Sequence, residues 1–401
     1  MTLDNDRKSP QSPSLANLFV SFFKLGLTAF GGPAMVPYIR RIVVERKRLI
    51  SDEMFKRGIA FCQMIPGATV MQLSAYIGLL TRGQYGAIVS FIGFALPSFI
   101  LMFILSVIYT HISNLSPFIS AFTGLHVIVV AIIAYAVVIF GRSSLKGIKD
   151  LIIAALASVM FIFGIHPILT IITAGILGYI LFKDKPSVGS NIECEKNNSI
   201  RTNNIRMVIL TLLIAIGGLA VLSIVDKRLF ELSFIMFRVD MFAFGGGFSA
   251  LPLLFHEIVT VRSWLSNSVF MDGIVLGQIT PGPIVITSTF IGYILKGPFG
   301  AFVATIYMFL PSFLILTCIE PYFNRLCNSR YFNRIVKGII CSFVGLLLST
   351  VIKFAINIDW SISKVILALI AFTALIFKVD IIWVVLGGIL ISILFISKLP
   401  F

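Results

Sequence analysis

Charged side chains are scarce in this chain. Of its 401 residues only 12% are charged, about half the share of a typical soluble protein, whereas 58% are hydrophobic. A water-soluble protein of this composition could not cover its surface with polar groups. The lipid bilayer is the solvent that suits such a chain, so the composition argues against a soluble enzyme or a soluble binding module.

Sequence motifs for catalysis and for nucleotide or metal binding are also absent. There is no G-x-S-x-G, H-E-x-x-H, P-loop or dinucleotide-binding pattern, and the five cysteines form no C-x-x-C pair. The four histidines are far apart in sequence and flanked by aliphatic residues, which favours packing or loop positions over metal ligation. We therefore expect no enzymatic activity, no metal and no cofactor, and any pumping has to draw on an ion gradient or the membrane potential.

Acidic residues are outnumbered by basic ones. The chain has 32 Lys and Arg against 17 Asp and Glu, a formal net charge of +15. In a soluble protein this excess would suggest nucleic acid. Here the basic residues lie between apolar stretches, which indicates cytoplasmic loops and anionic lipid headgroups instead. We expect the lipid bilayer as a partner and no nucleic acid.

Long apolar stretches recur along the chain. Runs of Ile, Val, Leu and Phe of about 20 residues satisfy the length of a transmembrane helix, and no stretch alternates with the period of two that a membrane barrel requires. The sequence therefore predicts an all-α polytopic membrane protein. Its apolar stretches after the first one lie at roughly 54–80, 85–110, 118–140, 150–182, 207–225, 230–255, 268–295, 299–319, 338–357 and 362–397.

Polar segments divide the chain into two halves. We expect residues 1–14 to be a disordered cytoplasmic tail and residues 183–206 to be a linker. The predicted organisation is a first repeat over 15–182, a connecting transmembrane helix over 207–229 and a second repeat over 230–401.

The two halves share three motifs in one order. The offsets are 245 − 31 = 214 for the Gly-Gly motif, 281 − 66 = 215 for the Pro-Gly motif with its Gln three residues before, and 310 − 96 = 214 for the Leu-Pro-Ser-Phe motif. This agreement over about 75 residues indicates an internal duplication. The matched motifs are Phe30-Gly31-Gly32 with Phe244-Gly245-Gly246, Gln63 and Pro66-Gly67 with Gln278 and Pro281-Gly282, and Leu96-Pro97-Ser98-Phe99 with Leu310-Pro311-Ser312-Phe313.

Matching loops of the two halves carry opposite charge bias. Loop 40–48 is strongly basic, whereas its counterpart 256–265 keeps one Arg; loop 111–117 has no Lys or Arg, whereas 320–337 has four. Because basic loops stay in the cytoplasm, matching loops should lie on opposite faces of the membrane. We predict two inverted-topology repeats, with the span at 207–225 supplying the odd crossing.

Charge also bears on the stretch 54–80. Loops 40–48 and 141–149 are both basic and should both be cytoplasmic, and the two stretches from 85 to 140 cross twice. Stretch 54–80 should then make no net crossing, and Pro66-Gly67 interrupts it. A re-entrant or broken hairpin fits, and the alternative is one kinked span with a misassigned loop.

Broken helices in both halves of an inverted repeat mark the binding site of a transporter. Each Gly-Gly or Pro-Gly break exposes a helix N-terminus, whose partial positive charge suits an anion. Lys24 lies seven residues before Gly31, and Arg238 lies seven before Gly245. A cation at that depth is a candidate for substrate binding, and the alternative is a long side chain that snorkels to the interface.

Other polar residues near the breaks complete the candidate site. The amides of Gln63 and Gln278 and the hydroxyl of Thr28 could donate to an anion, or they could hold helices together. Asp240 and Asp272 are acids within apolar stretches; we expect Asp240 to balance the charge of Arg238, and a proton-carrying role is the alternative. The predicted substrate-binding residues are Lys24, Thr28, Gly31, Gly32, Gln63, Pro66, Gly67, Arg238, Gly245, Gly246, Gln278, Pro281 and Gly282, with Asp240 and Asp272 assigned to coupling or charge balance.

The motifs resemble the chromate ion transporter family. The resemblance rests on FFKLGLTAFGGPAMVPYIRR at 22–41 and Gln63-x-x-Pro66-Gly67, and on MFAFGGGFSALPLL at 241–254 in the second half. It covers about 15–182 and 230–397, as in the long, two-domain form. It implies a multi-pass secondary transporter of the inner or plasma membrane that exports chromate, confers chromate resistance and meets sulfate as a similar oxyanion. Alternatives are a passive anion channel, a transporter of another oxyanion and a membrane accessory subunit, and the oligomeric state, a homodimer included, is left open.

Overall fold

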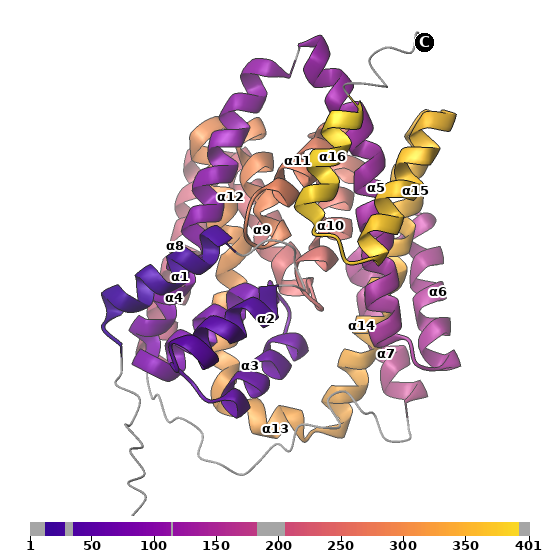
Figure 1. Cartoon of the computed structure of the whole chain (residues 1–401). Coiled ribbons are helices and arrows are strands. Elements are labelled where there is room, and N and C mark those ends of the chain that lie inside the picture. Colours follow the sequence, from indigo (N-terminus) through magenta and orange to yellow (C-terminus); the bar gives the residue numbers. More distant parts are fainter. Residues whose placement is uncertain (1–12, 29–34, 114, 183–204, 393–401) are drawn as a thin grey trace, which may run out of the picture.

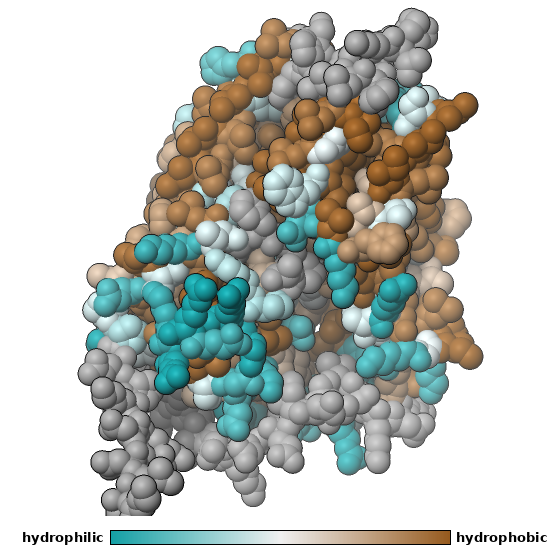
Figure 2. Space-filling model, in the orientation of Figure 1, coloured by the Kyte–Doolittle hydropathy of each residue, from teal (hydrophilic) through white to brown (hydrophobic). Residues whose placement is uncertain are grey.

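The protein is helical throughout the part of the chain that the structure describes. The computed structural model describes residues 13–28, 35–113, 115–182 and 205–392, and within these ranges it contains helices and no strand. Five helical segments in these ranges are long and apolar enough to cross a membrane. Figure 2 shows apolar side chains over most of the visible flank, with hydrophilic ones gathered mainly near α2 and α3. The predicted all-α polytopic membrane fold is confirmed.

Two helices of the first half form a re-entrant hairpin. Helix α3 (Asp52–Met64) and the beginning of α4 (Thr69–Ile112) flank the Pro66-Gly67 break. At Arg82 (φ −142°) and Gly83 (φ 63°) the chain of α4 reverses direction. An arm of 13 residues is about 20 Å long, too short for a hydrocarbon core of about 30 Å. The geometry agrees with the predicted hairpin rather than with a single kinked span.

The reversal within α4 brings backbone against backbone. A methyl group on Gly78 would lie 2.2 Å from the carbonyl oxygen of Gly86, so only glycine fits there. The two sides of this reversal are further joined by Ser90, whose hydroxyl donates to the carbonyl of Ser74 at 2.7 Å. Residues 84–112 then form the first long apolar span.

The second half repeats this local structure. Helix α11 (Asn267–Ile279) and the 3-10 turn η4 (Ile284–Ile286) precede α12 (Thr287–Ile319). The chain reverses in α12 at Lys296 (φ −146°) and Gly297 (φ 62°), 214 residues after Arg82 and Gly83 (296 − 82) and with nearly the same dihedral angles. A π-helix also recurs 215 residues on, as η2 (Arg41–Arg46) and η3 (His256–Val261). The internal repeat is therefore present in the backbone as well as in the sequence.

The Gly-Gly breaks lie between short helices. In the second half α9 (Lys227–Phe242) is followed by the break and by α10 (Gly247–Phe255). In the first half α1 (Leu15–Thr28) and α2 (Met35–Arg40) occupy the matching positions. The predicted Gly31 and Gly32 lie outside the described residues, as do most of the predicted tail and linker.

The helix between the halves is shorter than predicted. The predicted segment 207–229 is interrupted, because α8 (Ile205–Val225) ends before Asp226. The Asp226 carboxylate accepts hydrogen bonds from the backbone N–H groups of Arg228 and Leu229, which caps the N-terminus of α9. Residues 227–229 therefore belong to the second half.

Two helical hairpins lie toward opposite ends of the molecule (Figure 1). The hairpin of α6 (Ile148–Ile162) and α7 (Pro167–Leu181) packs on α14 (Arg330–Ile356), while the hairpin of α15 and α16 packs on α5. Each hairpin thus packs on a long helix of the other half. The hairpins α6–α7 and α15–α16 are equivalent in the two halves, and their places toward opposite ends are what an inverted arrangement requires. The remaining elements are α5 (Ser116–Ser144), η5 (Glu320–Tyr322), α13 (Phe323–Cys327), α15 (Ile362–Ile376) and α16 (Ile381–Ile391).

Candidate functional site

A cavity of about 340 Å³ lies where the breaks of the two halves meet. From the first half it is lined by the start of α2, by Gln63 at the end of α3, and by residues 68–70. From the second half it is lined by the Gly-Gly break and by the segment after Pro281-Gly282. The lining residues are Met35, Val36, Pro37, Gln63, Ala68, Thr69, Val70, Phe140, Gly245, Gly246, Gly247, Phe248, Pro283 and Ile284.

Two helix N-termini open on this cavity. Helix α4 begins after Ala68 and helix α10 begins after Gly246, and neither N-cap residue provides a side-chain hydrogen bond to the helix. The first N–H groups of a helix have no partner within the helix, and they carry the positive end of its dipole. The cavity therefore presents two sets of backbone donors to whatever it holds.

Glycine conformation explains why the helices begin at these places. Gly67 (φ 119°), Gly245 (φ 87°) and Gly246 (φ 104°) occupy the positive-φ region that other residues adopt only with strain. They turn the chain sharply just before α4 and α10 and so direct each N-terminus inward. This accounts for the repeated Gly-Gly and Pro-Gly motifs.

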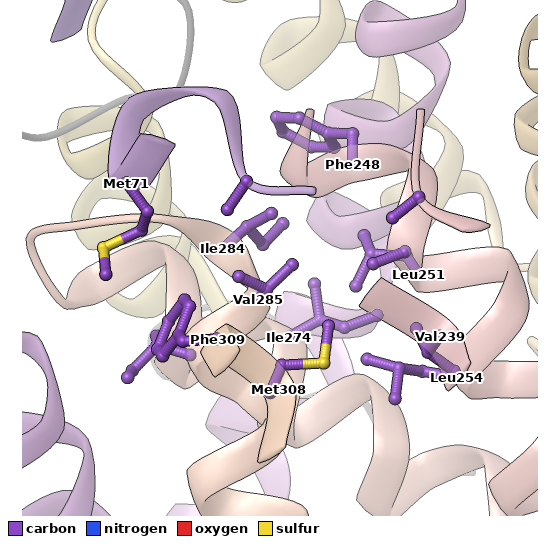
Figure 3. Close-up of a cluster of buried hydrophobic side chains, with 14 of the residues drawn as sticks. Met71, Val239, Phe248, Leu251, Leu254, Ile274, Ile284, Val285, Met308 and Phe309 are labelled. Atoms are coloured by element: carbon purple, nitrogen blue, oxygen red, sulfur yellow. The ribbon is translucent and has the colours of Figure 1, made fainter. Parts of the chain in front are cut away.

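The side chains around the cavity are mostly apolar. Gln63 contributes an amide and Thr69 a hydroxyl, and no Lys, Arg, Asp or Glu lines the cavity among the residues that the structure describes. Figure 3 shows Phe248 and Ile284, which line the cavity, packed in a buried apolar cluster with side chains such as Val285 and Leu251. The polar contribution is thus two helix termini and two neutral side chains on an apolar support.

Each Pro-Gly break packs against the long helix of the other half. A methyl group on Gly67 would lie 2.1 Å from Ser312 Oγ, and one on Gly282 would lie 2.0 Å from Ser98 Oγ. The backbone N–H of Gly67 also donates to the carbonyl of Ala243 at 2.9 Å. The predicted residues Pro66 and Pro281 hold these breaks but do not line the cavity.

Two predicted site residues of α1 lie away from the cavity. Lys24 and Thr28 are exposed, and the Thr28 hydroxyl donates to the backbone carbonyl of Lys24 at 2.8 Å. The core-facing side of α1 carries Leu18, Phe22 and Leu25, so Lys24 points away from the protein core. The position agrees with a snorkelling side chain and does not place the Lys24 ammonium at the cavity.

Arg238 forms an ion pair with Glu257, a residue that the sequence did not single out as a partner. The expectation that Asp240 balances Arg238 was therefore wrong. Glu257 is 5% exposed and also binds Arg262 Nη1 at 2.5 Å and His166 Nε2 at 3.0 Å. Its position in the π-helix η3, within loop 256–265, was the available signal: an acid in the Gly-Gly loop that keeps only one basic residue.

The two predicted acids are buried but do not line the cavity. Asp240 accepts hydrogen bonds from the backbone N–H and the hydroxyl of Ser312, at 2.7 and 2.6 Å. Asp272 is bound by His126 Nε2 at 2.6 Å and by the Tyr109 hydroxyl at 2.7 Å, both from the first half. Each acid therefore has a partner that sequence reasoning did not identify.

Of the two predicted glutamines, one lines the cavity. Gln63 does, whereas Gln278 is buried outside it and its Nε2 has no hydrogen-bond partner within the described part of the chain. Metal binding finds no support in the described ranges, where no three His, Cys, Asp or Glu side chains are grouped closely enough to hold an ion. The arrangement is suited to an anion held by neutral donors.

Comparison with protein families shows which family the chain belongs to. The family model described as "Chromate transporter" matches residues 16–179 and again residues 230–393. The chain belongs to the chromate transporter family. The two matched regions correspond to the two halves, and each contains one Gly-Gly and one Pro-Gly break. Membership in this family makes the chain a membrane transporter rather than an enzyme.

Individual relatives extend over nearly the whole chain. An uncharacterised transporter of Methanocaldococcus jannaschii is 39% identical over 94% of this chain and 93% of its own length. A chromate transport protein of Cupriavidus metallidurans is 30% identical over 89% of this chain and 86% of its own, and one of Pseudomonas aeruginosa is 27% identical over 86% and 82%. No solved structure matches the chain.

Proposed function

We propose that this protein is a secondary active transporter that exports chromate, or a similar tetrahedral dianion such as sulfate, across the cytoplasmic membrane. The family and the two relatives that are named chromate transport proteins support the substrate class. The observation that carries the proposal is that α4 and α10, one from each half, direct uncapped N-termini into one cavity.

The cavity has the chemistry that a dianion needs. Backbone N–H groups at a helix N-terminus bind phosphate- and sulfate-like groups through hydrogen bonds and the helix dipole. Gln63 and Thr69 add two side-chain donors. A volume of about 340 Å³ lies within the usual range of small-molecule sites, about 300–1,000 Å³. A neutral solute would gain nothing from the positive helix ends, so the site favours anions.

The way the cavity is built supports alternating access as the mechanism. Both halves line it, and each Pro-Gly break packs on the long helix of the other half. A rocking motion of one half against the other would open the same cavity first to one face and then to the other. Because the sequence has no nucleotide-binding motif, an ion gradient or the membrane potential supplies the energy.

Counterflow transport in proteoliposomes tests this function. Vesicles loaded with unlabelled sulfate or chromate should accumulate the labelled anion faster than empty vesicles, because a carrier returns faster when loaded. Equal rates would identify a passive channel, and no anion flux at all would indicate an accessory subunit. Uptake into everted membrane vesicles then tests the direction, since an exporter concentrates the anion inside them.

A further inference from the structure

The buried carboxylate of Asp240 on α9 is connected to the N-terminus of α4 through one side chain, that of Ser312. Asp240 is fully buried, and its Oδ2 accepts from the hydroxyl of Ser312 at 2.6 Å. The Ser312 hydroxyl oxygen in turn accepts from the backbone N–H of Ala68 at 3.0 Å. Ala68 is the N-cap of α4 and lines the cavity. Asp240, Ser312 and Ala68 therefore form a hydrogen-bond relay that ends at the proposed anion site.

The equivalent positions of the repeat do not form this relay. The counterpart of Asp240 is Gly26 (240 − 214), and the counterpart of Ala68 is Pro283 (68 + 215), which has no N–H to donate. Only the serine remains, as Ser98, and its hydroxyl is buried without a partner in the described ranges. The second Pro-Gly break therefore forms without the acceptor and the donor, so the relay at α4 is not a requirement of the fold.

No ion pair neutralises Asp240 among the residues that the structure describes. Its Oδ1 is buried and has no hydrogen-bond partner within the described part of the chain. Helix α9 packs against α8, α10 and α12. On these helices Arg206 is exposed at the start of α8, and Lys227 and Arg228 lie at the far end of α9 from Asp240. Arg238 is bound by Glu257, and Lys296 is bound by Asp226 at 2.6 Å. An ionised Asp240 would therefore act mainly on the N-terminus of α4.

We propose that the ionised carboxylate of Asp240 lowers the affinity of the cavity for the oxyanion and that a proton on Asp240 removes this effect. The negative charge offsets the positive end of α4 and repels a dianion bound in front of it. Linkage is reciprocal, so the oxyanion also favours the protonated acid, and the two bind together. This inference rests on the proposed function. One dianion and one proton carry one net negative charge, which an inside-negative membrane potential drives outward.

Equilibrium binding of labelled sulfate to the purified full-length protein tests the proposal. Sulfate is the suitable probe because it stays a dianion at neutral and at mildly acidic pH. Wild-type affinity should rise as the pH falls. Asp240→Asn keeps an oxygen that accepts from Ser312 but carries no charge. It should bind sulfate about tenfold more tightly at neutral pH, within the range of roughly 5- to 150-fold usual for coupled sites, and with little dependence on pH.

A matched control removes a charge from the same helix. Glu231→Gln lies nine residues before Asp240 and outside the relay, and it should keep the wild-type affinity and pH dependence. Asp240→Asn binding no more tightly than wild type, or with the same pH dependence, would overturn the proposal. If the variant does not reach the membrane, the wild-type protein decides, because an affinity independent of pH overturns it too. Absence of any sulfate or chromate binding by the wild type would instead overturn the proposed function.

Discussion

Gly246 of the second half lies against Thr69 of the first: a methyl group on Gly246 would lie 3.4 Å from Thr69 Oγ1. The two residues stand at the N-termini of α10 and α4, so the positive ends of these helices meet across the cavity. Helix termini of like charge repel each other unless an anion lies between them. We therefore expect the cavity to prefer a dianion, and substitutions of its lining residues are the first test.

Thr69→Val is the most conservative test of the site. It keeps the side-chain shape and removes the hydroxyl, so a direct hydrogen bond to a charged ligand is lost. Such a bond contributes about 1.5–3 kcal/mol, so sulfate or chromate affinity should fall roughly 10- to 150-fold. Thr81→Val on the same helix is the control, because the Thr81 hydroxyl donates to the carbonyl of Ile77 away from the cavity. Equal affinities for the two variants would remove Thr69 from the site.

Gln63 and Gln278 hold equivalent places in the two halves, yet only Gln63 lines the cavity. We expect Gln63→Ala to weaken anion binding by a factor similar to that of Thr69→Val. Gln278→Ala should leave the affinity unchanged. Titration of both purified variants with labelled sulfate checks this asymmetry. If only Gln278→Ala lowered the affinity, the anion site would lie beside the Pro-Gly break of the second half and not in this cavity.

The sequence was sufficient to predict where the helices of this fold are interrupted. Pro66-Gly67 recurs as Pro281-Gly282 because each break needs a glycine with positive φ. Gly83 and Gly297, which were not singled out from the sequence, recur in the same way where the chain reverses. Such requirements are local, so they leave a mark in the sequence. The depth of Lys24 in its apolar stretch was also readable from the sequence.

Contacts between the halves left no comparable mark. Ala68 and Ser312 are 244 residues apart, and no local pattern indicates that one donates to the other. The partner of Arg238 was also misassigned, although it lies in the same half, because Glu257 is in η3, beyond the turn between α9 and α10 and the whole of α10. Lys24 was predicted at the binding site from its depth in the apolar stretch alone. The face of the helix was not considered: the apolar side chains of α1 face the core, so Lys24 points away from it.

Lys24→Gln should therefore leave the oxyanion affinity as it is in the wild type. Arg238→Gln should also leave the affinity unchanged, but it should lower the amount of folded protein, because Glu257 loses one of its cations. Removing one partner of a buried ion pair costs about 3–5 kcal/mol, and we expect less here because Arg262 and His166 still bind Glu257. Thermal unfolding of the purified variants and sulfate titration separate the two effects.

A second change in the same pair serves as the control for Arg238→Gln. Adding Glu257→Gln removes the buried charge that the first change left unpaired, so the double variant should recover part of the lost stability. If either Lys24→Gln or Arg238→Gln weakens sulfate binding more than tenfold while the protein remains folded, the cations contribute to binding after all.

Gly78 and Gly292 test the repeated hairpins without touching the cavity. A methyl group on either would lie 2.2 Å from a backbone carbonyl, of Gly86 and Gly300 respectively. Backbone cannot yield as a side chain can, so Gly78→Ala and Gly292→Ala should each destabilise the protein by about 1–3 kcal/mol. The control is Gly217→Ala on α8, where a methyl group would meet nothing within 4 Å. Unfolding temperatures equal to that of the control would mean that the hairpins are looser than described.

Single-cysteine labelling tests the inverted topology on which alternating access depends. Cysteines placed in 40–48 and 320–337 should react with a membrane-impermeant reagent only from the cytoplasmic side, because these loops are basic. Cysteines in 111–117 and 256–265 should react only from outside. The hairpins α6–α7 and α15–α16, at opposite ends of the molecule, lead to the same expectation (Figure 1). Native Cys62 and Cys341 are buried, whereas Cys318 is exposed, so Cys318 is first replaced by Ser to keep the background reaction low. Labelling of 40–48 and 256–265 from the same side would contradict the inversion, because the two Gly-Gly breaks would then enter the membrane from one face and could not exchange roles during transport.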